Sequence, residues 1–117
     1  MSKAPKSLVR LLNLLSAMRE IAPFSALTAD EEQLLDELII RWHQASAVSV
    51  SEVMYEVSRA TSSTTYRRLV ALRDKGLVAF RTDPQDKRVR FVEPTVEAQK
   101  YMTALGDGLS ALINGAS

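Results

Sequence analysis

The sequence predicts a mainly helical α+β fold with one small β-hairpin, and three observations support this fold class. Apolar residues recur at helical spacing over most of the 117-residue chain. Two short alternating segments with strand-forming Val and Phe residues flank an Asp-Pro turn between residues 77 and 93. A further apolar stripe at helical spacing follows the second segment. The length is typical of one domain, so we expect residues 1–117 to fold as a unit.

The first helix is predicted over residues 6–21, and Pro23 ends it. Its apolar residues form more than one stripe, which favours a surface covered by a partner over a helix in the core of a monomer. These residues are Leu8, Val9, Leu11, Leu12, Leu14, Leu15, Met18 and Ile21.

The second helix is predicted to begin at Thr28, because Thr28-Ala29-Asp30-Glu31 has the spacing of a capping box. It should end near Gln44 or Ala45. The acidic pairs Glu31-Glu32 and Asp36-Glu37 are expected on its exposed side, where they would not act as a catalytic pair. Its inward face is predicted to contain Leu34, Leu35, Leu38, Ile39 and Trp42.

Residues 48–50 alternate and could form one small strand, and Ser49 could cap a short helix that ends near Ser58. A polar break over residues 60–63 precedes a helix predicted over residues 63–75. Gly76 then occupies the left-handed position that commonly ends a helix. The inward residues of this helix should be Thr65, Leu69 and Leu72.

The β-hairpin is predicted from strands over residues 77–82 and 88–93, joined by a turn over residues 83–87. Pro94 should stop the second strand. Thr95 can cap a last helix over residues 96–113.

This order of elements is typical of a winged helix-turn-helix, in which one helix enters the DNA major groove and a hairpin contacts the backbone or the minor groove. Hydroxyl side chains suit close approach to bases, and Arg suits guanine edges and phosphates. The residues expected to contact DNA are Ser62, Ser63, Thr64, Tyr66, Arg67 and Arg68 in the helix, and Arg81, Gln85, Lys87, Arg88 and Arg90 in the hairpin.

The distribution of charge favours a polyanionic partner. The whole chain carries +1, but residues 59–90 contain nine basic and three acidic residues, a net charge of +6, which leaves −5 for the rest. The alternatives are solvated charges that point in every direction and, for the hairpin, cations that only protect an exposed edge.

Composition argues against an enzyme. The chain has no cysteine and a single histidine, His43, which is expected at the surface or at a helix end. No phosphate-binding glycine loop or nucleophile motif is found, so we predict no catalytic residue, metal or cofactor. The N-terminal segment lacks a cleavage site and there is no long apolar run, so we expect a mature cytoplasmic protein without a membrane span.

Two segments resemble the MarR-type regulators. Residues 63–78 look like the recognition helix and following strand of that family, and residues 86–95 resemble its wing signature D-x-R-x-x-x-V-x-L-T. Pro94 stands at the leucine position of the signature, no glycine follows Thr95, and a single helix follows where members have two. The matching residues are Asp86, Arg88, Val92 and Thr95.

The resemblance implies a homodimeric transcription regulator, with repression expected over activation, and a pocket that can hold a small effector of unidentified chemistry. It implies that the first and last helices, within residues 1–27 and 95–117, form the dimer around a winged-helix core of residues 28–94. The alternatives are a plasmid or phage replication or partition protein and a protein–protein interaction module. The expected interface residues are Leu8, Leu11, Leu12, Leu15, Met18, Tyr101, Leu105, Leu109 and Leu112.

Overall fold

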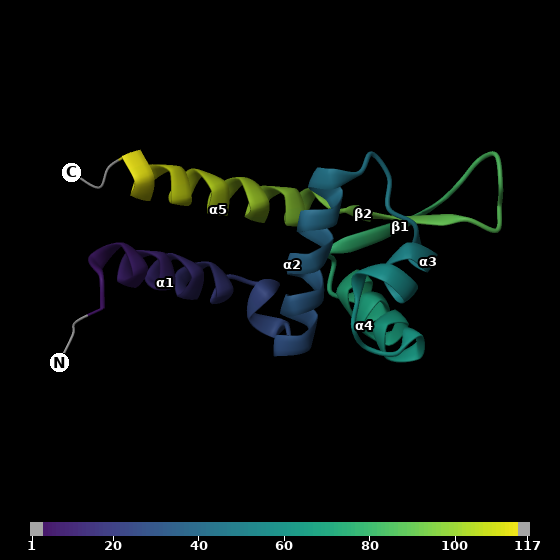
Figure 1. The fold of residues 1–117 in the computed structure, drawn as a ribbon, viewed down its shortest axis with the longest axis horizontal. Coiled ribbons are helices and arrows are strands. Elements are labelled where there is room, and N and C mark those ends of the chain that lie inside the picture. Colours follow the sequence, from purple (N-terminus) through teal and green to yellow (C-terminus); the bar gives the residue numbers. More distant parts are fainter. Residues whose placement is uncertain (1–3, 115–117) are drawn as a thin grey trace.

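The structure, a computed structural model, describes residues 4–114 and has the predicted mainly helical architecture (Figure 1). The α-helices are α1 (Lys6–Arg19), α2 (Ala29–Gln44), α3 (Val50–Glu52), α4 (Ser62–Asp74) and α5 (Val96–Asn114). A 3-10 turn (Phe24–Ala26) precedes α2, and a π-helical turn (Val53–Val57) continues α3. The strands are β1 (Val78–Thr82) and β2 (Arg90–Pro94).

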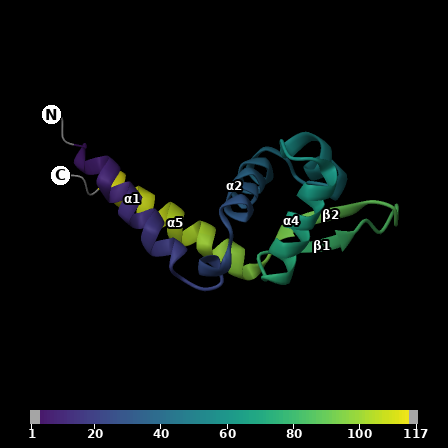
Figure 2. The same cartoon turned by 90° about the horizontal axis from the view of Figure 1, so that it is seen from below.

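The molecule consists of a lobe and an arm. The lobe contains residues 24–95, and the arm is the antiparallel pair α1 and α5, which lie side by side and extend away from the lobe (Figures 1 and 2). The radius of gyration is 16.2 Å and the extents are 55 × 27 × 25 Å. A compact domain of this length has a radius of gyration of about 13 Å, so the arm accounts for an elongated shape.

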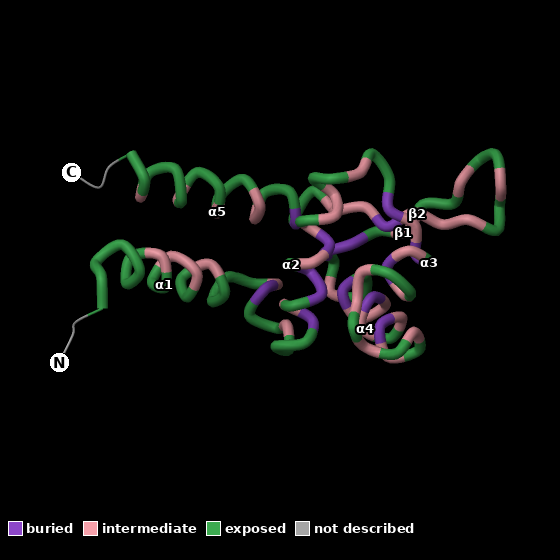
Figure 3. Tube along the Cα trace, in the orientation of Figure 1, coloured by how far each residue is buried: buried purple, intermediate pink, exposed green. Residues whose placement is uncertain are grey.

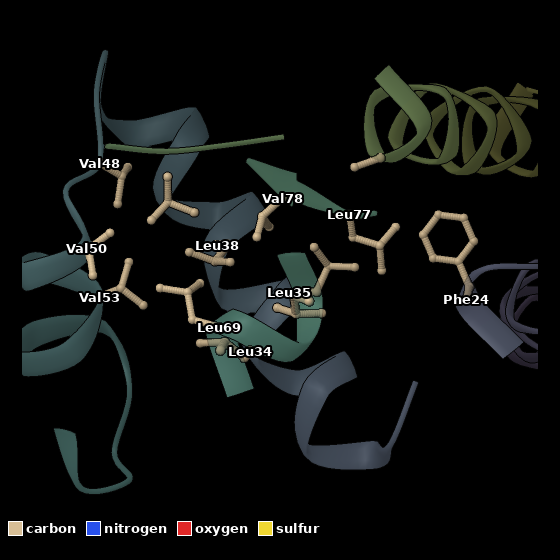
Figure 4. Close-up of a cluster of buried hydrophobic side chains, with 13 residues drawn as sticks. Phe24, Leu34, Leu35, Leu38, Val48, Val50, Val53, Leu69, Leu77 and Val78 are labelled. Atoms are coloured by element: carbon tan, nitrogen blue, oxygen red, sulfur yellow. The ribbon is translucent and has the colours of Figure 1, made fainter. Parts of the chain in front are cut away.

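The hydrophobic core lies in the lobe, between α2, α4 and the hairpin (Figures 3 and 4). The predicted inward residues Thr65, Leu69 and Leu72 of α4 are fully buried, and so is Leu38 of α2. No residue of α1 is buried, and Ala98 alone is buried in α5. The buried hydrophobic residues are Phe24, Leu34, Leu35, Leu38, Val48, Val50, Val53, Leu69, Leu72, Leu77, Val78, Val92 and Ala98.

The predicted helix boundaries are confirmed where a side chain caps the backbone. Thr28 and Glu31 form the complete capping box of α2, and Ser49 accepts from the Glu52 amide at the start of α3. Thr95 accepts from the Ala98 amide at the start of α5. After α4, Gly76 has φ 84°, the left-handed conformation that glycine adopts without steric strain.

The hairpin is antiparallel, with Phe80 opposite Val92 and Thr82 opposite Arg90. The short strand expected at residues 48–50 is reduced to a bridge between Ser49 and Phe91, beside a bond from the Val92 amide to the Val48 carbonyl at 2.8 Å. The indole Nε1 of Trp42 also donates to the Val92 carbonyl, at 2.9 Å, and so attaches α2 to β2.

Two helices differ from the prediction by more than a one-residue shift of an end. The first helix ends at Arg19 rather than at Ile21, and the Glu20 amide bonds back to the Ala17 carbonyl in a tighter last turn. The helix after Ser49 widens into a π turn, in which the Ser58 amide bonds to the Val53 carbonyl. Ser58 Oγ then accepts from the buried Thr65 hydroxyl at 2.9 Å, which joins this turn to α4.

The prediction that the acidic pairs lie on the exposed side of α2 is wrong for Glu31, which is only 8% exposed. The ammonium of Lys75, at the end of α4, forms an ion pair with the Glu31 carboxylate and donates to the Ala26 carbonyl at 2.9 Å. Burial raises the pKa of Glu31, but hydrogen bonds from Lys75 and the Thr28 amide outweigh burial, so that the net pKa is lowered.

We expect Glu31→Gln to lower the free energy of unfolding by about 1 kcal/mol at neutral pH, because the charge is lost while the cap can persist. The folded-state pKa of Glu31 is depressed, so its contribution is present above the ordinary pKa of 4.5 and is lost as the pH falls through the folded value. Urea unfolding from pH 7 to pH 3 should therefore show the two proteins converging in acid. A constant difference across this range would contradict the ion pair's role.

Candidate nucleic-acid interface

Helix α4 has three distinct polar sides around its buried stripe. With about 3.6 residues per turn, Ser63 and Arg67 project away from the core, whereas Tyr66 and Arg73 lie together on a second side. Thr64 and Arg68 lie on the remaining side. The contacts of these residues confirm that the second side meets the hairpin and the third meets α2. The α4 residues expected to contact DNA therefore lie on three different sides, which face solvent, the hairpin and α2.

The outward side of α4 makes the fewest contacts with the rest of the fold. Ser63 and Arg67 are both exposed and lie one turn apart. The Arg67 guanidinium makes one long contact, Nη2 to the Thr64 hydroxyl at 3.4 Å. Thr61 caps the helix by accepting from the Thr64 amide at 3.3 Å, and Ser63 is the second residue of the helix. An exposed guanidinium and hydroxyl in the first turns can bond to base edges or phosphates.

On the hairpin side, four residues from α4, β1 and β2 are in contact. The Arg90 guanidinium lies 5.8 Å from the Tyr66 ring centroid and 5.1 Å from the Phe80 ring centroid. Its Nη2 donates to the Tyr66 hydroxyl at 3.2 Å. The Arg73 guanidinium lies 5.1 Å from the same Phe80 ring. We call these four residues the aromatic–arginine cluster.

On the α2 side, Arg68 contacts Asp30 rather than solvent alone. Its Nη2 lies 3.2 Å from the Asp30 carboxylate, across the start of α2. Ser62, by contrast, is half-buried one turn before Tyr66 and so lies on the hairpin side. Arg68 is therefore directed toward α2, whereas its neighbour Arg67 projects from the outward side.

The tip of the hairpin is shaped by two aspartates. Asp83 Oδ1 accepts from the Gln85 amide at 2.9 Å, and Asp86 Oδ1 accepts from the Arg88 amide at 3.1 Å. The Arg88 guanidinium also forms a bidentate pair with Asp86, at 3.1 and 3.2 Å, which lowers the pKa of that carboxyl. The Arg88 side chain remains 89% exposed, and Lys87 beside it is exposed. The tip therefore contains both an Asp86–Arg88 pair that stiffens the turn and two cations, Lys87 and Arg88, that face solvent.

Arg81 lies on the other face of the hairpin from Arg90. Arg81 is opposite Phe91 in the register, whereas Arg90 is opposite Thr82, and adjacent residues in a strand point to opposite faces. The Arg81 guanidinium lies 4.9 Å from the Phe91 ring and pairs with Glu93. Among the predicted DNA contacts, Arg81 is thus the one placed on the side away from α4.

Three basic residues of this region were not among the predicted contacts, and one of them, Lys75, is the partner of Glu31. Arg59 is exposed in the turn before α4, and Arg73 belongs to the aromatic–arginine cluster and pairs with Asp74 at 3.4 Å. The signal for Arg73 was its seven-residue spacing from Tyr66, which places both on one side of a helix. Of the nine cations, Arg68, Lys75 and Arg81 pair with acids outside residues 59–90.

Other kinds of site have less support in residues 4–114. These residues contain no group of three or more side chains able to hold a metal ion. Within the same range, no helix has both the length and the apolar character needed to cross a bilayer. An open, largely apolar groove of about 710 Å³ lies between the outer ends of the arm helices, and its lining includes Leu8, Leu11, Leu109 and Leu112.

Comparison with solved structures identifies proteins of the same fold. A MarR-like transcriptional regulator from Thermotoga maritima is 18% identical, with a TM-score of 0.62 over 99% of this chain and 82% of that chain. A MarR family regulator from Streptomyces coelicolor, solved in complex with DNA, is 17% identical, with a TM-score of 0.55 over 95% and 69%. BpsR from Bordetella bronchiseptica, whose DNA binding is regulated by 6-hydroxynicotinic acid, is 19% identical, with a TM-score of 0.54 over 94% and 77%.

These similarities establish the fold. The chain has the winged helix-turn-helix fold of these structures, and β1–β2 is its hairpin wing. The predicted fold class and its resemblance to these regulators are confirmed. No family model and no curated protein sequence matches the chain.

Proposed function

We propose that this chain is a dimeric, sequence-specific regulator of transcription that binds double-stranded DNA and represses as MarR-type regulators do. The observation that carries this proposal is the outward side of α4, where Ser63 and Arg67 are exposed beside a wing with cations at its tip. The regulator from Streptomyces coelicolor, which shares this fold, was solved bound to DNA. Residues 59–90 also carry the excess of positive charge that a polyanion requires.

Helix α4 would enter the major groove with its N-terminal turns toward the bases. Ser63 and Arg67 would then reach base edges or the nearest phosphates, since both project away from the core. A guanidinium can bond guanine O6 and N7 together, which makes Arg67 the main candidate for sequence reading. Ser62 and Thr64 would contact the backbone beside the helix start, and Arg68 would do so only at the edge that faces α2.

The wing would approach the minor groove or the adjacent backbone with its tip. Gln85, Lys87 and Arg88 lie in the loop between β1 and β2, and all three are exposed. Asp86 holds the Arg88 guanidinium at the tip through two bonds, so that the cation is oriented before DNA arrives. Arg81 would contribute charge from the other face of the wing.

The arm would form the homodimer. The exposed residues Leu8, Leu12 and Leu109 and the half-buried Leu11 and Leu112 give it an apolar surface that the described chain leaves uncovered. The remaining expected interface residues, Leu15, Met18, Tyr101 and Leu105, are half-buried within the chain.

Repression would follow from occupancy of a near-palindromic operator, which blocks polymerase access. A small effector that changes DNA binding, as 6-hydroxynicotinic acid does for BpsR, would enter a cavity of about 140 Å³ between arm and lobe. This cavity is lined in part by Leu15, Phe24 and Tyr101.

Selection of bound duplexes from a random-sequence pool tests the proposal. The selected sites should contain two related half-sites, because a two-fold symmetric dimer reads two copies of one sequence. Their affinity should fall steeply as salt rises. Recovery of sequences no different from the starting pool, with no salt-sensitive shift, would favour the protein–protein interaction module instead.

Arg88→Ala should weaken binding to all selected duplexes by a similar factor. It should also lower the slope of log affinity against log salt by about one unit for each phosphate that the wing no longer neutralises. The expected reason is that a wing cation neutralises backbone charge without reading sequence. Fluorescence anisotropy titrations at several salt concentrations measure both quantities. An unchanged affinity and slope would show that the Asp86–Arg88 pair only stabilises the turn and that Arg88 does not contact DNA.

A further inference from the structure

The aromatic–arginine cluster joins α4 to the wing through contacts between two arginines and two aromatic rings. Phe80 and Arg90 lie on the hairpin face that also carries the buried residues Val78 and Val92, next to α4. Two guanidiniums, from Arg73 and Arg90, lie over the single Phe80 ring. Contact of a cation with an aromatic face is favourable, and two such contacts fix the relative position of β1, β2 and α4.

Within this cluster the Tyr66 hydroxyl is an acceptor. Arg90 Nη2 donates to Tyr66 Oη at 3.2 Å, so the phenolic O–H points elsewhere and can donate in turn. The hydrogen bond from Arg90 and the charge of that residue lower the pKa of Tyr66. A phenol polarised in this way is a stronger donor, and an anionic oxygen is the acceptor that gains most from it.

The acceptor that fits this position is a DNA phosphate. Tyr66 is adjacent in sequence to Arg67, and its hydroxyl contacts Arg90, the residue at which β2 begins after the wing loop. Tyrosine hydroxyls are common donors to phosphate oxygens, where they set the register of a protein on the duplex. The nearby positive charge of Arg73 and Arg90 favours the same anion.

We propose that the Tyr66 hydroxyl donates to a DNA phosphate and that Arg90 is a positioning residue that acts through it, holding the phenol and the wing in place before DNA binds. Arg90 differs in this from Arg88, whose guanidinium is at the tip and almost fully exposed. Arg90 is half-buried, with its guanidinium over two rings and one of its donors used by Tyr66. This inference rests on the proposed DNA-binding function.

A double-mutant cycle on the full-length chain tests the proposal, with a duplex selected from the random pool as the probe. Tyr66→Phe keeps the ring and removes the donor, and it should weaken binding by about tenfold in each half-site, as expected for loss of one hydrogen bond to a charged acceptor. Arg90→Met should weaken binding by a similar factor. The double variant should be no weaker than either single variant, because both changes remove the same interaction with DNA.

Arg81→Met is the matched control, since it removes the same charge from the other face of the same hairpin, also next to a phenylalanine. It should have a smaller effect on affinity, and that effect should add to the effect of Tyr66→Phe. Arg90→Leu, which can pack against the same rings, serves as a second variant if Arg90→Met unfolds. Thermal melting establishes that each variant is folded.

Titration of the tyrosine absorbance in the free protein gives a second readout that does not depend on DNA. The chain has three tyrosines, and Tyr66→Phe identifies the one whose pKa is lowered. That pKa should return toward the ordinary value in Arg90→Met and stay lowered in Arg81→Met. If the pKa of Tyr66 does not change in Arg90→Met, the positioning role of Arg90 is overturned, whatever the effect on DNA binding.

The DNA-binding results distinguish a failure of this inference from a failure of the proposed function on which it rests. Wild-type binding with no loss in Tyr66→Phe would overturn the phosphate contact and leave the proposed function intact. A further loss from Arg90→Met in the Tyr66→Phe background, with a salt slope lower by about one unit, would make Arg90 a phosphate ligand and overturn its positioning role. Failure of the wild-type chain to bind any duplex would overturn the proposed function, and the phosphate contact with it.

Discussion

A chain that carries both Leu12→Glu and Leu109→Glu should be a monomer and should lose its affinity for operator DNA. The two leucines are 52% and 44% exposed, so the changes leave the described packing of the arm largely intact. A dimer would contain four such side chains at its interface. At about 1 kcal/mol or more for each, their loss should raise the dimer dissociation constant by at least about a thousandfold.

Sedimentation equilibrium at micromolar concentration measures this effect, and circular dichroism checks that the helices persist. Tyr55→Gln is the control, because it removes a large, even more exposed hydrophobic side chain (69%) from the lobe rather than from the arm. The control should remain a dimer. A wild-type chain that sediments as a monomer, or a dimer unaffected by the two glutamates, would show that the arm is not the interface.

The elements of the fold were predictable because their signals are local. Thr28 and Glu31 are three residues apart, and a capping box requires no knowledge of the tertiary structure. Gly76 marked the end of α4 for the same kind of reason, since only the adjacent backbone demands a positive φ. The inward stripe of α4 followed from helical spacing alone.

The partners of the charged residues were not predictable from the sequence. Arg68 meets Asp30 and Lys75 meets Glu31 across separations of 38 and 44 residues. Charge and spacing show which side of a helix such a residue occupies, but the acid it meets depends on how two helices approach each other. This is why Glu31 was expected on the exposed side, although the approach of α4 buries it.

The candidate site was predictable in its residue types and less so in its arrangement. Hydroxyl and guanidinium groups in a helix before a basic hairpin were sufficient to predict α4 and the hairpin as the candidate site. The separation of Arg81 from Arg90 depended on the strand register, which the turn length does not define here because the loop spans residues 83–89. The contact between Tyr66 and Arg90 joins two elements 24 residues apart and could be found only in the folded chain.

Arg67→Lys should reduce operator affinity by about 1–3 kcal/mol in each half-site and relax the base preference at one position. The reason is that lysine keeps the charge but lacks the planar fork that bonds guanine O6 and N7 together. Arg67 is exposed on the outward side of α4, and its one contact, with Thr64, is long, so the substitution disturbs little else. In a dimer the two α4 helices would lie in successive major grooves, about 34–36 Å apart, so the relaxed position should appear in both half-sites.

Arg68→Lys is the matched control, because it makes the same change one residue further along, on the side of α4 that pairs with Asp30. It should leave the base preference unchanged. Binding selections repeated with both variants measure preference, and anisotropy measures affinity. Near-normal affinity and unchanged preference in Arg67→Lys would assign Arg67 to a phosphate. Full, sequence-selective binding by a folded variant that lacks the Ser63, Thr64, Tyr66 and Arg67 side chains together would show that α4 does not read DNA.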